Sequence, residues 1–275
     1  MKRTDKRSGD LERSHKLGWL LAGRPRLVAL ALGLTLALLV LVAVLTPAKD
    51  LLGLGSGGAP SAQRAVIVDQ LSLTAPNPDF IRTATATLKK GGYEVDYYPG
   101  EVVTVGFYRS LPERGYDLIV LRTHSTAVIS RGEESVPTVS LFTNEVYNKE
   151  EYYDEQVAGR LGFASYFEGG PQVFGITAEF VRQSIHGSFD NALIVMMGCD
   201  GLKNDEAARA FLERGASAYV SWSEFVSAPH TDAATERLLE LLTSDVPLKD
   251  AVAQTNAEIG PDPAFGSQLL YRPTE

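Results

Sequence analysis

Residues 193–201 read Leu-Ile-Val-Met-Met-Gly-Cys-Asp-Gly, and this stretch decides the fold class of the chain. Its first five residues form an uninterrupted apolar run, which predicts a strand buried on both faces, as in a parallel sheet. The run is followed by Gly198 and by Cys199, the single cysteine among 275 residues. Open α/β sheets place their ligands beyond the carboxyl ends of the strands, so the sequence predicts a site at Cys199.

Residues 117–125 repeat this design, because the apolar run 118–121 ends shortly before His124. Neighbouring parallel strands lie about 4.8 Å apart, so adjacent strands would bring His124 within reach of Cys199. A thiol beside an imidazole is a nucleophile with a proton shuttle. The alternative is that Cys199 is a small buried hydrophobe, as free cysteines often are. Its position at a strand end favours a catalytic thiol, with His124 as the catalytic base.

Apolar strands alternate with helical patterns along residues 64–275, which we expect to form one folded domain. This alternation predicts an α/β fold, with a mostly parallel sheet and helices on both faces. Residues 126–175 interrupt the pattern as a long insertion rich in Tyr and Glu, and loops of that length are usually functional or mobile. Strands are expected at 65–71, 93–98, 118–121, 193–197 and 218–222, and helices at 77–90, 107–114, 177–185, 204–214, 231–242 and 246–259.

The N-terminal part predicts a membrane anchor. Residues 27–45 are an uncharged, mostly apolar run of 19, close to the ~20 residues that cross a bilayer as a helix. Residues 1–26 carry eight basic and three acidic side chains, so the positive-inside rule places this tail in the cytoplasm and the C-terminal domain outside the cytoplasm. Residues 46–63 are typical of a flexible linker. A cleavable signal peptide is the alternative, although its apolar region should span about 7 to 15 residues.

Charge and cysteine content exclude several functions. The whole chain carries −8 and residues 1–26 carry +5, which leaves −13 for the remainder. Nucleic acid is therefore not an expected partner, because phosphate binding needs a basic surface. One cysteine allows no intrachain disulfide, and four dispersed histidines offer no close ligand pair for a metal. We expect no metal and no cofactor, and the oligomeric state stays open.

The order of these features resembles the caspase-like cysteine peptidases, which include caspases, gingipains, clostripain, legumain and separase. The resemblance covers residues 65–259 and rests on His124 at one strand end, on residues 198–201 at another, and on the helix end and strand at 215–223. It implies a three-layer sandwich and a Cys199/His124 dyad that hydrolyses peptide bonds. Backbone N–H groups of Ser125 and Cys199 would then hold the oxyanion. In the resembled fold the strand after the cysteine lines the substrate pocket, which gives the candidates Ser221, Trp222, Ser223 and Glu224.

Two further points leave the function open. Caspase-like peptidases generally have Gly directly after the histidine, where this chain has Ser125. His186 and His230 are alternative partners for the thiol, although neither ends a strand. The sequence therefore predicts a membrane-anchored cysteine endopeptidase that acts on a peptide or protein substrate. The alternative is a non-catalytic module of the same fold that binds a peptide or a partner protein.

Overall fold

The structure is a computed structural model that describes residues 62–131 and 134–274. The chain divides into two units, Met1–Ser61 and Ala62–Glu275, and the described residues belong to the second. The predicted cytoplasmic tail, the membrane span at 27–45 and nearly all of the linker at 46–63 lie outside the described residues. Among the described residues, no helix combines the length and the apolar character needed to span a bilayer.

A six-stranded sheet forms the centre of the described unit, in the order β10-β9-β8-β3-β1-β2. Five strands of this sheet, β1, β2, β3, β8 and β9, pair in parallel. The sixth, β10, is antiparallel to β9 at the edge of the sheet. The predicted mostly parallel sheet is therefore confirmed, whereas the edge strand β10 was not predicted. The strands are β1 (Arg64–Asp69), β2 (Glu94–Pro99), β3 (Leu118–Arg122), β8 (Leu193–Met196), β9 (Ala218–Trp222) and β10 (Leu269–Pro273).

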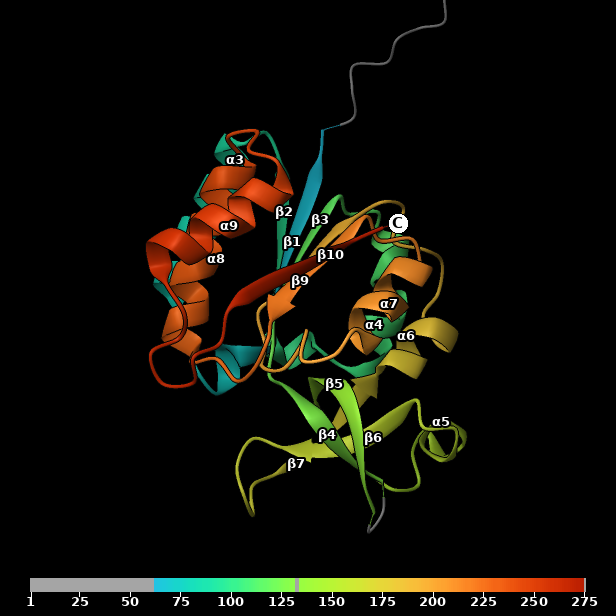
Figure 1. Cartoon of the computed structure of the whole chain (residues 1–275). Coiled ribbons are helices and arrows are strands. Elements are labelled where there is room, and N and C mark those ends of the chain that lie inside the picture. Colours follow the sequence, from blue (N-terminus) through green and yellow to red (C-terminus); the bar gives the residue numbers. More distant parts are fainter. Residues whose placement is uncertain (1–61, 132–133, 275) are drawn as a thin grey trace, which may run out of the picture. The chain divides into compact units, whose positions relative to one another are not determined.

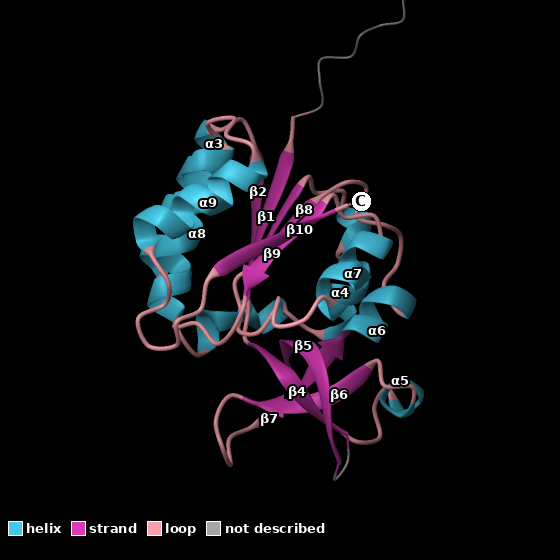
Figure 2. Ribbon diagram, viewed as in Figure 1, coloured by secondary structure: helices cyan, strands magenta, loops and turns pink. Residues whose placement is uncertain are grey.

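Helices cover both faces of this sheet, as predicted (Figures 1 and 2). One face carries α3 (Pro78–Lys90), α8 (Ala228–Leu242) and α9 (Leu248–Ile259), and the other carries α4 (Val105–Ser110), α6 (Ala178–Gln183) and α7 (Glu206–Glu213). The predicted start of α3 is confirmed, because Asn77 Oδ1 accepts a hydrogen bond from Phe80 N at 3.1 Å. The start of α7 differs from the prediction: its N-cap is Asp205, while Asn204 Oδ1 accepts from Glu206 N at 3.0 Å.

The insertion after His124 is a closed antiparallel barrel, in the order β4-β5-β7-β6. Its elements are β4 (Ser125–Arg131), β5 (Glu134–Val146), α5 (Tyr153–Val157), β6 (Leu161–Ser165) and β7 (Gln172–Thr177). Regular strands thus replace the long loop that the sequence pattern indicated. The strands escaped prediction because the barrel buries polar residues, including Thr138, Ser140 and Thr143, which break the apolar alternation.

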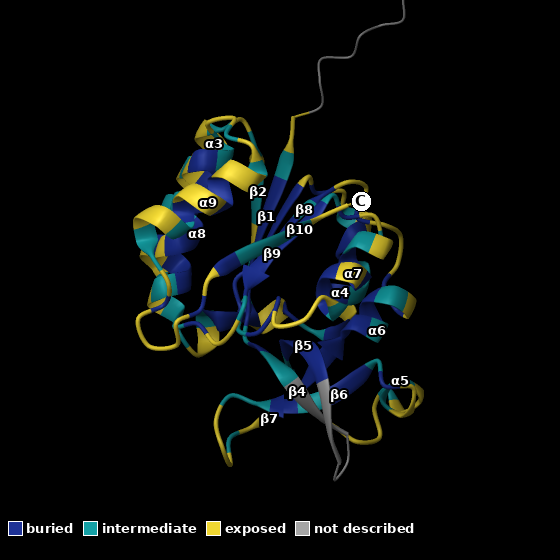
Figure 3. Ribbon diagram, in the orientation of Figure 1, coloured by how far each residue is buried: buried dark blue, intermediate teal, exposed yellow. Residues whose placement is uncertain are grey.

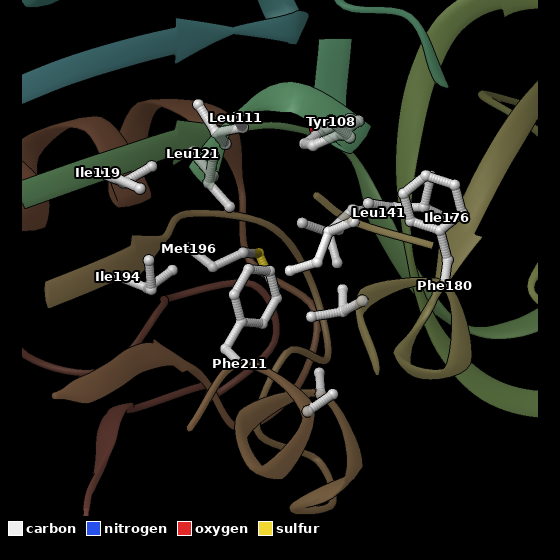
Figure 4. Close-up of a cluster of buried hydrophobic side chains, with 14 of the residues drawn as sticks. Tyr108, Leu111, Ile119, Leu121, Leu141, Ile176, Phe180, Ile194, Met196 and Phe211 are labelled. Atoms are coloured by element: carbon white, nitrogen blue, oxygen red, sulfur yellow. The ribbon is translucent and has the colours of Figure 1, made fainter. Parts of the chain in front are cut away.

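The barrel packs against the carboxyl ends of the parallel strands and shares their core (Figure 1). Leu141 of β5 and Ile176 of β7 belong to the same buried cluster as Leu121 of β3 and Met196 of β8 (Figure 4). Figure 3 shows that the central strands of the sheet and the adjoining part of the barrel are buried, while the edge strands β2 and β10 and the outer helix faces are more exposed. Apolar packing therefore fixes the barrel next to the strand ends that carry His124 and Cys199.

Candidate functional site

The ends of β3 and β8 lie side by side. The two strands pair in parallel with Leu121 opposite Met196, so His124 and Cys199 each lie three residues beyond the last paired position. Two hydrogen bonds continue the contact beyond the strands, because Met197 N donates to Leu121 O at 2.9 Å and Ser125 Oγ donates to Cys199 O at 2.5 Å. The expectation that the two predicted strands are neighbours is confirmed.

Glycines allow the chain around Cys199 to approach its neighbours closely. A Cβ on Gly198 would stand 2.5 Å from the carbonyl oxygen of Thr123, and a Cβ on Gly201 would overlap Met196 and Ser221. Between these glycines, Asp200 has φ 57°, in the left-handed region that Asp and Asn tolerate better than most residues. The turn that carries Cys199 thus depends on small side chains and on one unusual backbone conformation.

The Cys199 thiol is free and half-buried. Its Sγ lies 3.5 Å from the backbone nitrogen of Val226 and 3.6 Å from the carbonyl oxygen of the same residue. Burial raises the pKa of the Cys199 thiol, and the negative charges of Asp200 and Asp262 act in the same direction, while the N–H groups of Val226 and of Cys199 itself oppose them. The environment therefore favours the protonated thiol at neutral pH.

The His124 imidazole is held from the side of β1 and of the barrel. Its Nε2 lies 2.9 Å from Thr74 Oγ1, and its backbone N–H donates to Gln70 Oε1 at 2.8 Å. The rings of Tyr166 and Phe142 lie 5.1 and 5.9 Å from the imidazole, centroid to centroid. Thr74 therefore engages Nε2 of the imidazole, and Nδ1 is the ring nitrogen that it does not contact.

Burial lowers the pKa of His124 to about 4, and the positive charge of Arg122 adds to this effect. The imidazole is therefore neutral at physiological pH and can accept a proton. Within residues 62–131 and 134–274 no hydrogen bond joins the imidazole to Cys199 Sγ. The two groups lie on neighbouring chain segments, each with partners of its own.

A buried ion cluster fixes the end of β3 immediately before His124. Arg122 donates to Asp69 at the end of β1 at 2.8 Å and to Asp232 of α8 at 2.7 and 2.8 Å. All three side chains are almost completely buried. Asn77 also donates to Asp232, at 2.9 Å. The cluster joins β1, β3, the start of α3 and α8 at the edge of the sheet where the candidate residues lie.

The four predicted pocket residues fall into two pairs. Ser221 and Trp222 are 0% and 1% exposed, and their polar atoms are bonded internally: Ser221 Oγ to Met196 O and Trp222 Nε1 to Thr231 Oγ1, both at 2.8 Å. Ser223 is half-buried and Glu224 is exposed, with Glu224 Oε2 2.7 Å from Lys203 Nζ. Only the second pair is accessible to a ligand without rearrangement.

The alternative histidines lie elsewhere. His186 is exposed, with Nδ1 3.8 Å from Glu113 Oε2. His230 lies in α8 with its ring 5.3 Å from that of Trp222, and its Nε2 is buried without a hydrogen-bond partner in the described part of the chain. Of the described histidines, His124 is the one that follows a strand adjacent to β8. Across the same described residues, no group of three or more His, Cys, Asp or Glu side chains is arranged to hold a metal ion.

Several residues that contact the site were not identified from the sequence. Gln70 had a visible signal, because it directly follows β1 and so lies at the same sheet edge as His124. Thr74 lies in the turn that follows, and its contact with His124 depends on the turn conformation. Tyr166 and Val226 had no local signal, since each reaches the site through folding of a distant segment.

Comparison with known proteins identifies no family. No protein-family model matches the chain, and no curated protein matches it in sequence. Among solved structures it is similar to the Arg-specific cysteine proteinase gingipain R, with 12% sequence identity and a TM-score of 0.45. The similarity covers 78% of this chain and 47% of that one, so this chain spans about half the length of the gingipain structure. A likeness this remote carries no argument about activity.

Proposed function

We propose that this chain is a cysteine peptidase of the caspase-like type, with Cys199 as the nucleophile and His124 as the proton shuttle. The observation that carries the proposal is the pairing of β3 with β8, which brings both residues to one edge of the sheet. The hydrogen bond from Ser125 Oγ to Cys199 O supports it further, because it joins the residue after His124 to Cys199 itself.

The protonation states fit a general-base mechanism. The thiol is protonated and the imidazole neutral at pH 7, so His124 would accept the thiol proton as the sulfur attacks the peptide carbonyl. The Ser125 and Cys199 N–H groups would bind the oxyanion. The imidazolium would then protonate the amine as the C–N bond breaks, and water would hydrolyse the resulting thioester.

Location is part of the same proposal. Residues 27–45 would anchor the chain in the cell membrane, with the basic tail in the cytoplasm and the described unit outside it. The support is the apolar run and the charge asymmetry of the sequence. Accessibility of residues 62–274 to added protease in intact cells, compared with lysed cells, tests this part independently of activity.

The test of activity uses the full-length chain and a peptide library read by mass spectrometry. Cys199→Ala and His124→Ala should each lower kcat/KM by at least about 10³-fold, as loss of a nucleophile or its base does in other hydrolases. His186→Ala is the matched control, because it removes an exposed histidine and should leave kcat/KM unchanged. Full activity of the Cys199→Ala protein would remove the proposal.

The pH profile gives a sharper test of the base. Only the neutral imidazole can accept the thiol proton, and the pKa of His124 is about 4. The acid limb of kcat/KM should therefore have its midpoint near pH 4 and not near 6.5, the ordinary value for histidine. A midpoint near 6.5 would mean that another group supplies the base.

A non-catalytic peptide-binding module is the second candidate. The raised pKa of the thiol and the separate hydrogen-bond partners of Cys199 and His124 favour it. In that case the wild-type protein would show no turnover, and Cys199→Ala would bind peptides as tightly as the wild type. Alkylation of Cys199 by iodoacetamide would also be slow at pH 7 and unaffected by His124→Ala.

A further inference from the structure

Exposed apolar residues are neighbours, along the chain, of residues that contact Cys199 and His124. Large apolar residues that are about half exposed or more are few among the described residues, and single ones need no explanation. Three of them, however, directly precede or follow a residue that contacts Cys199 or His124, and a fourth packs on one of these three. They are Leu73 (52% exposed), Phe167 (64%), Phe225 (48%) and Phe265 (53%).

On the thiol side, two of these residues form a pair. Phe225 directly precedes Val226, whose backbone contacts Cys199 Sγ. The ring of Phe225 lies 5.9 Å from that of Phe265, at an interplanar angle of 49°. Aromatic pairs at this separation are mutually stabilising even when they are exposed. The pair is therefore an exposed apolar surface on the chain segment whose next residue contacts the thiol.

Hydrogen bonds to Asp262 connect the two loop segments that carry this pair. The carboxylate of Asp262 accepts hydrogen bonds from Ser227 N at 2.9 Å and from Phe265 N at 3.0 Å. Asp262 is 1% exposed, so these bonds are shielded from water. Asp262 thereby fixes the backbone of Phe265 and that of Ser227, two residues after Phe225, so a ligand that contacts the pair pays little ordering entropy.

On the imidazole side, Leu73 directly precedes Thr74, which bonds His124 Nε2, and Phe167 directly follows Tyr166, whose ring lies against His124. Apolar surface thus adjoins the partners of both candidate catalytic groups.

The carboxylates near Cys199 are already matched by a cation of the chain itself. Lys203 Nζ lies 2.7 Å from Glu224 Oε2 and 3.5 Å from Asp200 Oδ1. A basic ligand side chain would have to displace this lysine to pair with either acid. Asp200 and Glu224 are thus paired with Lys203, and Asp262 is bound by backbone N–H groups, so a basic side chain finds no free carboxylate to pair with, while an acidic one would be repelled by Asp200 and Asp262.

We propose that the site selects peptides by a large apolar side chain, aromatic or aliphatic, that packs on the Phe225–Phe265 pair next to Cys199. The proposal rests on the proposed function for the identity of the ligand as a peptide. It assigns the specificity to residues outside the four that the sequence suggested, and it makes the preference one for shape and apolar area and not for charge.

Binding can be measured without cleavage in the full-length Cys199→Ala protein. The probes are fluorescein-labelled nonapeptide mixtures whose central residue is fixed as Phe, Leu, Arg or Asp, with randomised flanks, read by fluorescence anisotropy. The Phe and Leu mixtures should bind at least about tenfold more tightly than the Arg and Asp mixtures, the factor expected for burying one such side chain. Phe225→Ala and Phe265→Ala should each remove most of this difference, and Phe225→Leu should keep most of it.

Tyr153→Ala is the matched control, because Tyr153 is a 64% exposed aromatic residue on α5 and should not affect binding. Equal binding of the four mixtures, a preference for Arg or Asp, no detectable binding, or an unchanged preference in Phe225→Ala with normal circular dichroism would each overturn the proposal. The peptidase proposal fails separately. If the wild-type protein binds the Phe mixture selectively but never cleaves it, the apolar selectivity stands and the catalytic role of Cys199 falls.

Discussion

The ends of β3 and β8 lie next to each other but are held by different forces. The end of β3 is fixed by charge and directional hydrogen bonds, with Arg122 between Asp69 and Asp232. The end of β8 is fixed by close packing, with Gly198 N 3.0 Å from Met196 Sδ and no room for a Cβ. The contrast shows that one strand end depends on which groups are ionised, while the other depends on how small its residues are.

The largest expected effect comes from removing the charge that fixes the end of β3. Arg122→Met would leave Asp69 and Asp232 buried without their cation, and the free energy of unfolding should fall by about 3 to 5 kcal/mol. Denaturant unfolding measures it. Arg237→Met is the matched control, since Arg237 also holds two carboxylates, Glu240 and Glu258, but at the surface. Equal losses in the two variants would show that burial of the cluster contributes nothing.

The stability of the β3 end should also depend on pH, through His124. Its folded-state pKa of about 4 lies below the ordinary value near 6.5, so the unfolded chain binds the proton more readily between these values. This contribution to stability is complete above pH 6.5 and is lost as the pH falls toward 4. Between pH 7.5 and 4.5 the wild type should therefore lose roughly 2 to 3 kcal/mol more unfolding free energy than His124→Gln. Parallel pH profiles for the two proteins would contradict the buried, neutral imidazole.

The end of β8 should respond to added side-chain volume. Gly198→Ala places a Cβ against the carbonyl oxygen of Thr123 and the hydroxyl of Ser125, and should cost about 1 to 3 kcal/mol in thermal or denaturant unfolding. Gly106→Ala is the control, because its Cβ would meet nothing nearer than Thr104 Oγ1 at 3.7 Å. It lies within α4 and should be neutral or slightly stabilising. If Gly198→Ala is as stable as Gly106→Ala, the contacts of a Cβ on Gly198 with Thr123 and Ser125 are not as close as 2.5 Å or less.

The smallest expected effect lies where the two ends meet. Ser125→Ala removes the hydrogen bond to Cys199 O and should lower the unfolding free energy by about 1 kcal/mol. Ser244→Ala, which removes an exposed hydroxyl bonded to Glu240 O, should change almost nothing. The rate of Cys199 alkylation should change in the Ser125 variant alone. An unchanged rate there would mean that Ser125 does not position the cysteine.

Much of the sheet followed from the sequence, because strands buried on both faces read as continuous apolar runs. Residues 193–197 and 118–121 are of this kind, and their pairing in β8 and β3 matches the expectation. The edge strand β10 could not be recognised in this way, since its residues are mostly half-exposed and pair with β9 alone. The barrel escaped prediction because buried Ser and Thr interrupt the alternation on which a strand prediction depends.

The site was predictable only where a residue ends its own strand. His124 and Cys199 meet that condition, and so does Gln70 after β1, although its role as acceptor for His124 N depends on the turn that follows. Tyr166 reaches His124 from the far end of β6, and Val226 reaches Cys199 from the loop before α8. These contacts are tertiary, so no local pattern encodes them.

Only Thr123 and His124 separate the last residue of β3 from the first residue of β4. The imidazole therefore sits on the two-residue joint between the sheet and the barrel, with Tyr166 of the barrel pressed against its ring. The chain has no slack at this joint, and the Ser125 hydroxyl at the start of β4 also donates to Cys199 O, so any displacement of the barrel would move the imidazole and the turn that carries Cys199 together.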